Sequence, residues 1–235
     1  MGLYFRQLLA GREIARANRA AGQMANFVYL VGDTEVRECL AVDPAWDVGG
    51  ILAAAAMDEM KVVGALVTHY HPDHCGGSLF GLDIEGIASL LETNPCKIWV
   101  NRHEAEGLRK VTGVSESDLS LVDSGDTSQI GSIPVQFIHT PGHTPGSHCF
   151  LVEGRLISGD TLFIQGCGRV DLPGGNAEQM YESLTQKLAA LPDDTVLFPG
   201  HDYADRPSST LGDEKRSNVY LKPRSLEDWL RVRFK

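Results

Sequence analysis

The sequence of 235 residues has no hydrophobic run of the length that a membrane span needs, and it has no excess of basic residues. A transmembrane helix requires about 20 consecutive apolar residues, so we do not expect a membrane protein. The formal net charge is -10, with 31 acidic residues against 21 lysines and arginines. Nucleic acids and anionic membranes are bound through basic surfaces, and we therefore expect neither as the main partner.

Paired cysteines are also lacking. The five cysteines are an odd number, and no two of them form a C-x-x-C motif. A reduced, intracellular protein is the simplest interpretation. Residues 1–21 carry several arginines without a continuous apolar segment, so they do not predict a secretory signal. We expect the protein to work in the cytoplasm.

No internal repeat, low-complexity segment or linker rich in proline, glycine or charge divides the chain. We therefore expect one domain over residues 1–235, with a short helical tail at about 222–235. Strands are predicted at 27–31, 39–43, 62–67, 98–100, 135–138, 149–152, 155–158 and 195–198, and helices at 48–60, 84–92, 104–110, 177–190 and 225–234. This alternation, with hairpin pairs as well as crossovers, favours a layered α/β (α+β) domain with mixed sheets.

The most informative segment follows the predicted strand at 62–67. There, His69, His71, Asp73 and His74 lie within six residues. Imidazole nitrogens and carboxylate oxygens are the ligands that divalent metals take from proteins. Three other predicted strands are followed by one such residue each, namely His143, Asp160 and His201. Four strand ends that carry these groups predict a metal site at one edge of a sheet.

The remaining histidines do not follow this pattern. His103 opens a predicted helix in a polar setting, and His148 lies just before a predicted strand. We expect both to be structural or exposed to solvent. His139 follows an apolar strand, and it either orients a metal ligand or has no part in the site.

The motif H-x-H-x-D-H, followed at a distance by His143, Asp160 and His201, resembles the metallo-β-lactamase superfamily over residues 24–221. The resemblance implies a four-layer αββα sandwich with the metal site at one edge. It also implies two divalent metal ions, zinc being the first choice. The implied ligands are His69, His71 and His143 for one metal, Asp73, His74 and His201 for the other, and Asp160 as the bridging carboxylate.

Several branches of that superfamily fit less well. The β-lactamases are usually exported and do not use a bridging aspartate, whereas this chain has Asp160. Flavodiiron proteins carry a glutamate at the position of His71. Homoserine-lactone hydrolases place a tyrosine three residues after the bridging aspartate, and this chain has Phe163 there.

Two branches remain. Residues 158–169, 178–184 and 191–203 resemble glyoxalase II, which is hydroxyacylglutathione hydrolase. The sequence after His201 leaves no room for the helical C-terminal domain of that family. The short tail, the Arg169-x-Asp171 pair and residues 209–218 resemble the persulfide dioxygenases, which use a single iron. We predict a glyoxalase II-like thioesterase, with the dioxygenase as the alternative.

Each branch assigns the same residues differently. In a hydrolase, two metals lower the pKa of water from about 15.7 to roughly 7, and hydroxide attacks the thioester. Asp73 is then the candidate catalytic residue, which orients the nucleophile or moves its proton. In a dioxygenase, His69, His143 and Asp160 form a two-histidine, one-carboxylate face on ferrous iron. The ligand set does not separate the two reactions.

The predicted partner is a small-molecule substrate, either a glutathione thioester or another thiol adduct. Arg169 is the candidate substrate-binding cation, and a structural salt bridge to Asp171 is an equal alternative. Cys75 and Cys167 lie near the ligands, but a metal hydrolase needs no protein nucleophile, so we expect packing roles. Superfamily members without a C-terminal domain often associate, so a homo-oligomer is also considered. A non-enzymatic metal-binding protein is disfavoured because all seven ligand positions are filled.

Overall fold

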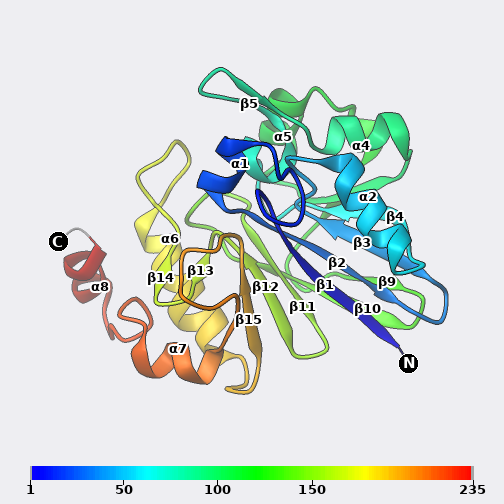
Figure 1. The fold of residues 1–235 in the computed structure, drawn as a ribbon. Coiled ribbons are helices and arrows are strands. Elements are labelled where there is room, and N and C mark those ends of the chain that lie inside the picture. Colours follow the sequence, from blue (N-terminus) through cyan, green and yellow to red (C-terminus); the bar gives the residue numbers. More distant parts are fainter. Residues whose placement is uncertain (1, 234–235) are drawn as a thin grey trace.

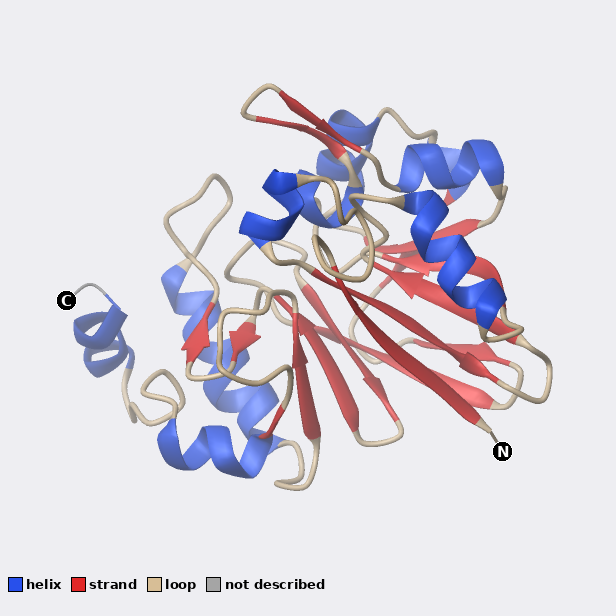
Figure 2. Cartoon of the chain, viewed as in Figure 1, coloured by secondary structure: helices blue, strands red, loops and turns tan. Residues whose placement is uncertain are grey.

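Two mixed sheets pack face to face in the computed structural model, which describes residues 2–233. Helices cover the outer faces of both sheets, as Figures 1 and 2 show. This is the αββα layer order that the sequence implied, and the predicted fold class is confirmed.

The first sheet comes from the N-terminal half of the chain. Its strand order is β1 (Leu3–Leu9), β2 (Phe27–Asp33), β3 (Glu38–Val42), β4 (Lys61–Leu66), β7 (Lys97–Asn101) and β8 (Leu119–Val122). The strands β3, β4, β7 and β8 run parallel to one another, whereas β2 is antiparallel to both β1 and β3. Parallel neighbours end at the same edge of a sheet, so the residues that follow β3 and β4 lie close together.

The second sheet comes from the C-terminal half. Its strand order is β16 (Ser209–Thr210), β15 (Val196–Pro199), β12 (Arg155–Gly159), β11 (His148–Val152), β10 (Ile133–His139) and β9 (Thr127–Ile130). The strand β12 is parallel to β15, and β11 is antiparallel to both β10 and β12. The strands β10, β12 and β15 therefore point the same way, and the residues after them meet at one edge.

The layer between the sheets is apolar. It joins Phe27, Tyr29 and Val31 of β2 to Phe137 of β10 and Phe150 of β11. The rings of Phe137 and Phe150 meet edge to face with centroids 5.5 Å apart. Burial of an aromatic side chain contributes roughly 1.5–3 kcal/mol to stability, so this layer fixes the relation of the two sheets.

Two groups of helices complete the layers. On the first sheet lie α1 (Arg19–Met24), α2 (Val48–Met57), α4 (Ile87–Thr93) and α5 (Ala105–Thr112). On the second lie α6 (Ala177–Glu182), a π turn (Ser183–Lys187) and a 3-10 turn (Leu188–Ala190) that continue it, α7 (Leu211–Ser217) and α8 (Leu226–Arg233). Shorter pieces are α3 (Pro72–Cys75), a 3-10 turn (Glu116–Asp118), the hairpin of β5 (Gly77–Leu79) and β6 (Leu82–Ile84), and the hairpin of β13 (Leu162–Phe163) and β14 (Gly166–Cys167).

Two predicted helices have different limits in the structure. The helix expected at 48–60 ends at Met57, and Glu59 then adopts a left-handed φ of 58° that no helix can contain. The helix expected at 84–92 begins only at Ile87, and Ile84 belongs to β6. Gly86 lies between them. Its backbone approaches the Cys75 carbonyl so closely that a Cβ there would lie 2.1 Å from the carbonyl oxygen, so only glycine fits.

The C-terminal tail packs against α6. The helix α8 begins at Leu226, directly after the predicted cap, and Ser225 caps it by accepting a hydrogen bond from the Asp228 N–H. Trp229 is fully buried and donates from Nε1 to the Tyr220 carbonyl oxygen. The predicted end of this helix at Phe234 lies outside the described residues.

Within residues 2–233, no helix has both the length and the apolar composition needed to traverse a bilayer.

Candidate metal centre

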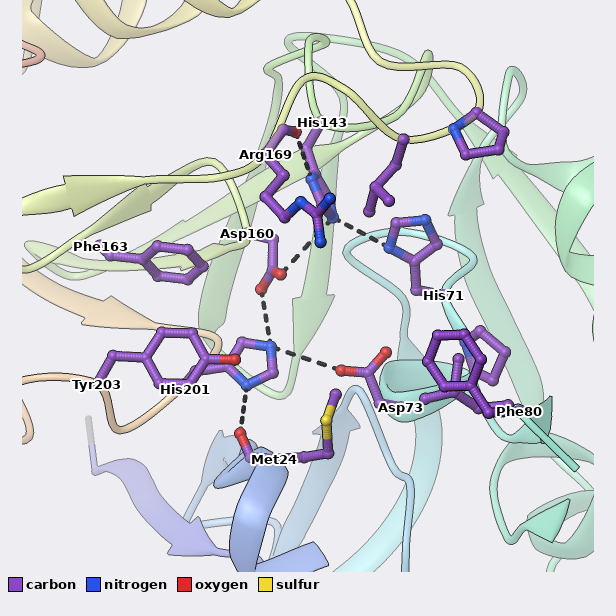
Figure 3. Close-up of a pocket in the computed structure, with 14 residues that line it drawn as sticks. Met24, His71, Asp73, Phe80, His143, Asp160, Phe163, Arg169, His201 and Tyr203 are labelled. Atoms are coloured by element: carbon purple, nitrogen blue, oxygen red, sulfur yellow. Dashed lines mark hydrogen bonds and ion pairs between the residues drawn. The ribbon is translucent and has the colours of Figure 1, made fainter. Parts of the chain in front are cut away.

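The seven predicted ligands come together at the edge where β4, β10, β12 and β15 end. Figure 3 shows five of them, His71, Asp73, His143, Asp160 and His201, converging on one pocket. Six of them form two groups of three donor atoms, which are His69, His71 and His143, and Asp73, His74 and His201, and a third group joins Asp43 to His69 and His74. Within each group the donor atoms lie within 4.8 Å of one another.

The ring nitrogens in each group face one another directly. In the first group, His71 Nδ1 lies 3.1 Å from His69 Nε2 and 3.0 Å from His143 Nε2. In the second, His74 Nε2 lies 3.2 Å from His201 Nε2, and Asp73 Oδ2 is 3.4 Å from the former and 3.5 Å from the latter. Donor atoms at these separations can share one ion.

Hydrogen bonds on the outside of the site fix which nitrogen points inward. His143 Nδ1 donates to the Arg169 carbonyl oxygen, and His201 Nδ1 donates to the Met24 carbonyl oxygen, each at 2.8 Å. The lone pair of each Nε2 therefore faces the interior of the site. Outer partners of this kind orient histidine ligands and raise their basicity.

Asp43 performs this role for two further ligands. Its Oδ2 accepts from His74 Nδ1 at 2.9 Å and from the Thr68 hydroxyl at 2.6 Å, and its Oδ1 accepts from the Thr68 N–H at 2.7 Å. Because the Thr68 hydroxyl donates to Asp43, its oxygen accepts from His69 Nδ1, 3.0 Å away. Through these outer hydrogen bonds, Asp43 keeps the Nε2 atoms of His69 and His74 pointing into the site.

The sequence analysis did not identify Asp43. A signal was present, because Asp43 directly follows β3, and β3 runs parallel to the strand that leads to His69. Asp73 also has an outer partner that was not predicted. Asn26 Nδ2 donates to Asp73 Oδ2 at 3.0 Å, while Asn26 Oδ1 accepts from Trp46 Nε1 at 3.0 Å.

Asp160 lies between the two groups. Its Oδ1 is 3.4 Å from both His74 Nε2 and His201 Nε2, and its Oδ2 is 3.6 Å from His143 Nε2. Gly200 allows this placement, since a Cβ there would lie 2.5 Å from Asp160 Oδ1. That oxygen is shielded from solvent and has no hydrogen-bond partner within the described residues. A buried oxygen of this kind, beside the inward-facing nitrogens of His74 and His201, fits a cation.

The pKa shifts divide the site into two parts. Burial and the neighbouring imidazoles lower the pKa of His69 well below its usual value and that of His71 to about 4. Burial alone would also lower the pKa of His74 and His201, but the Asp160 and Asp73 carboxylates outweigh burial, so both pKa values are raised. The carboxylates thus favour positive charge at the second group, which a metal ion also supplies.

Glu104 joins the two ligand loops from behind. This fully buried carboxylate accepts from the Tyr70 N–H at 2.8 Å with Oε2 and from the Gly146 N–H at 2.6 Å with Oε1. Tyr70 lies between His69 and His71, and Gly146 lies in the loop of His143. The sequence predicted Glu104 only as the first residue of a helix.

Replacement of Glu104 by glutamine is expected to lower the free energy of unfolding by about 1–3 kcal/mol, because one backbone N–H loses its acceptor and faces an amide donor. Urea unfolding of the metal-free protein measures this. The control is Glu106→Gln, an exposed position on α5 that changes the same charge. Equal unfolding midpoints for the two variants would show that Glu104 does not brace the loops.

The ligand groups open into a pocket of about 450 Å³. Arg169 lines it, and also forms a bidentate pair with Asp171, Nε to Oδ1 at 3.0 Å and Nη2 to Oδ2 at 2.8 Å. The salt bridge that the sequence offered as one alternative for Arg169 is therefore present, and its substrate-binding role stays a prediction. Lys215 and Arg216 do not line the pocket; Lys215 pairs with Asp193 and Arg216 with Asp213.

The other candidate residues lie outside this pocket. Burial raises the pKa of Cys167 to about 12 and that of Cys75 well above its usual value, so neither thiol is ionised near neutral pH. His139 Nε2 donates to the Pro145 carbonyl oxygen, and its ring stacks on that of His103. His148 is the first residue of β11 and is buried, so the sequence placed it slightly too far from the strand.

Comparison with known proteins gives one family. Residues 21–201 match the family described as the metallo-beta-lactamase superfamily. The mitochondrial persulfide dioxygenase ETHE1 of Homo sapiens is 33% identical over 215 residues, which are 88% of this chain and 75% of that protein. The hydroxyacylglutathione hydrolase of Polaromonas is 35% identical over 184 residues, which are 77% of this chain and 63% of that protein.

Among solved structures, ETHE1 from Myxococcus xanthus superimposes with a TM-score of 0.79 at 30% identity. The match covers 99% of this chain and 90% of the other. Both branches considered from the sequence are therefore among the relatives.

Proposed function

The chain belongs to the metallo-β-lactamase superfamily, and on that premise we propose that it is a two-metal hydrolase that cleaves a thioester. The observation that carries the proposal is the pair of three-donor groups with Asp160 between them. A single ion would use only one group and leave inward-facing lone pairs in the other. Imidazole and carboxylate donors suit zinc.

The proposed ligands follow the geometry. His69, His71 and His143 hold one metal, Asp73, His74 and His201 hold the other, and Asp160 bridges them. Bound zinc supplies Lewis-acid polarisation of a carbonyl and lowers the pKa of water toward neutrality. The chain must then bind the substrate, orient it and handle the proton.

Asp73 is proposed to handle the proton. Its Oδ2 is occupied by Asn26 and faces His74 and His201, which leaves Oδ1 to accept a proton from the attacking water. The side chain lines the pocket, so it can reach a substrate there.

Arg169 is proposed to bind the substrate through a neutral oxygen. Its hydrogen bonds to Asp171 use Nε and Nη2, which leaves the Nη1 donors for a carbonyl group. Arg169 lines the same pocket as Asp160 and His143 (Figure 3), so a substrate bound there comes within its reach.

The second candidate function is persulfide dioxygenase. It is favoured by the match to ETHE1 from Myxococcus xanthus, which extends over nearly the whole of both chains. Here His69, His143 and Asp160 would hold one iron. The second group would then serve as hydrogen-bond partners around it.

Metal analysis of the purified protein, together with two assays, tests the proposal. We expect about two zinc ions per chain. We also expect hydrolysis of a simple acetyl thioester, measured by the thiol that it releases. The matched assay follows oxygen consumption with glutathione persulfide. One iron per chain with oxygen uptake and no thioester hydrolysis would replace the hydrolase by the dioxygenase.

We further propose that the protein works in a reducing compartment such as the cytoplasm. All five cysteines are free in the structure, and Cys39, Cys75 and Cys149 are buried. Free buried thiols are typical of proteins that are never exposed to an oxidising environment.

A further inference from the structure

The walls of the pocket indicate what the substrate carries beside its thioester. Resting on the proposed hydrolase function, we propose that this substrate bears an apolar, uncharged group next to the reacting carbon, and that it is not a glutathione conjugate. Three observations support this proposal: the apolar walls of the pocket, the ion pair that Arg169 already forms with Asp171, and the exposure of Phe80.

The walls are mostly apolar. Away from the ligands and Arg169, the pocket is lined by Met24, Pro72, Leu79, Phe80, Phe163, Leu172, Pro173 and Tyr203. A wall of this kind gains free energy by covering apolar surface, and it offers few partners to a charged group. The volume of about 450 Å³ is within the usual range of small-molecule sites.

Charge in the pocket does not favour an anionic thiol. Among the described residues that line it, Arg169 is the one lysine or arginine, and Asp171 pairs with it in a bidentate geometry. Glutathione carries two carboxylates, and these would find no uncompensated cationic side chain beyond the metal groups.

Phe80 supplies the most specific evidence. It stands at the tip of the β5–β6 hairpin, which projects from the body of the molecule in Figure 1, and its side chain is fully exposed at 102%. Its backbone has a left-handed φ of 51°, and Gly81 follows with a φ of 82°. An aromatic side chain held in solvent gains free energy only when something covers it, and Phe80 borders the pocket.

The opposite wall is aromatic as well. Phe163 and Tyr203 meet edge to face with centroids 5.5 Å apart, and Tyr203 stacks on the His201 ring at 4.6 Å. Figure 3 places this pair across the ligands from Phe80. An occupant between the two walls contacts aromatic surface on both sides, which suits an aliphatic or aromatic group.

The test uses the zinc-loaded full chain and acyl thioesters of N-acetylcysteamine, a neutral thiol, from acetyl to octanoyl. We expect kcat/KM to rise roughly fourfold per methylene until the pocket is full. S-octanoylglutathione should be slower than the matched octanoyl thioester by about tenfold or more. Acetyl thioesters of alkyl thiols form a second arm, and a rise in that series alone would place the apolar group on the thiol side and contradict its placement next to the reacting carbon.

Phe80→Ala is expected to reduce the ratio of octanoyl to acetyl kcat/KM by about tenfold, and Phe80→Leu should restore most of it. The control is Met57→Ala, which removes an exposed apolar side chain on α2 outside the pocket and should leave the ratio unchanged.

Hydrolysis without any dependence on chain length in either arm, or a preference for the glutathione thioester, would overturn the apolar substrate and leave the hydrolase intact. An equal loss for all substrates in Phe80→Ala would also contradict it. Absence of hydrolysis for every thioester would overturn both proposals.

Discussion

Replacement of Asp160 by alanine should remove metal and hydrolysis together, with kcat/KM lower by about a thousandfold or more. The carboxylate lies between the two groups, 3.4 Å from His74 and His201 nitrogens and 3.6 Å from His143. Its loss deprives both metals of a ligand at once. It also removes the negative charge that favours a cation beside His74 and His201.

The measurement is metal content by elemental analysis, alongside the thioester assay, on protein purified in parallel with the natural sequence. Asp171→Ala serves as the control for metal content only, because it removes an exposed aspartate that belongs to neither group but holds Arg169. Full metal occupancy in Asp160→Ala would show that the bridging assignment is wrong. Loss of metal in both variants would point to a general effect of removing charge near the pocket.

The second large effect is expected at Asp43. Asp43→Ala leaves the Thr68 N–H, the Thr68 hydroxyl and His74 Nδ1 without their acceptor in a buried setting. We expect a loss of about 3 kcal/mol or more in the free energy of unfolding. Metal affinity should fall by about 10–100-fold, because His69 and His74 lose the partners that orient them.

Asp33 provides a matched control for this experiment. It is equally buried, at the end of β2, and accepts hydrogen bonds from Ser132 N–H, the Ser132 hydroxyl and Glu35 N–H. Asp33→Ala should destabilise the fold without changing metal affinity. Urea unfolding of the metal-free proteins and metal titration separate the two effects. Identical affinity for metal in both variants would show that Asp43 does not orient the metal ligands.

The sequence indicated for a physical reason which side chains meet at this edge of the sheets. Histidine and aspartate are rarely gathered this closely in a sequence without a shared role. The segments that carry them follow strands, and a strand is recognised from the apolar pattern of its own residues. The structure brings all seven together. Asp43 and Glu104 were missed because their roles depend on contacts with Thr68, 25 residues away, and with Tyr70, 34 residues away. No local spacing records such a contact.

Two elements near the site were missed for related reasons. The strand β1, Leu3–Leu9, was examined as a targeting segment, yet it pairs with β2 along its whole length. The β5–β6 hairpin has only three residues in each strand, too few to show alternation. Its glycine-rich surroundings indicate a turn, but they do not say that the tip borders a pocket.

The position of His201 has a consequence for how the protein is made. The Phe27 N–H donates to the Gly200 carbonyl oxygen at 2.8 Å, and His201 donates to Met24, so an early part of the chain meets a late one. During synthesis, the group of His69, His71 and His143 has all its members once residue 143 has left the ribosome. The second group must wait for His201. An ion held by this second group can therefore be loaded only after residue 201 has emerged.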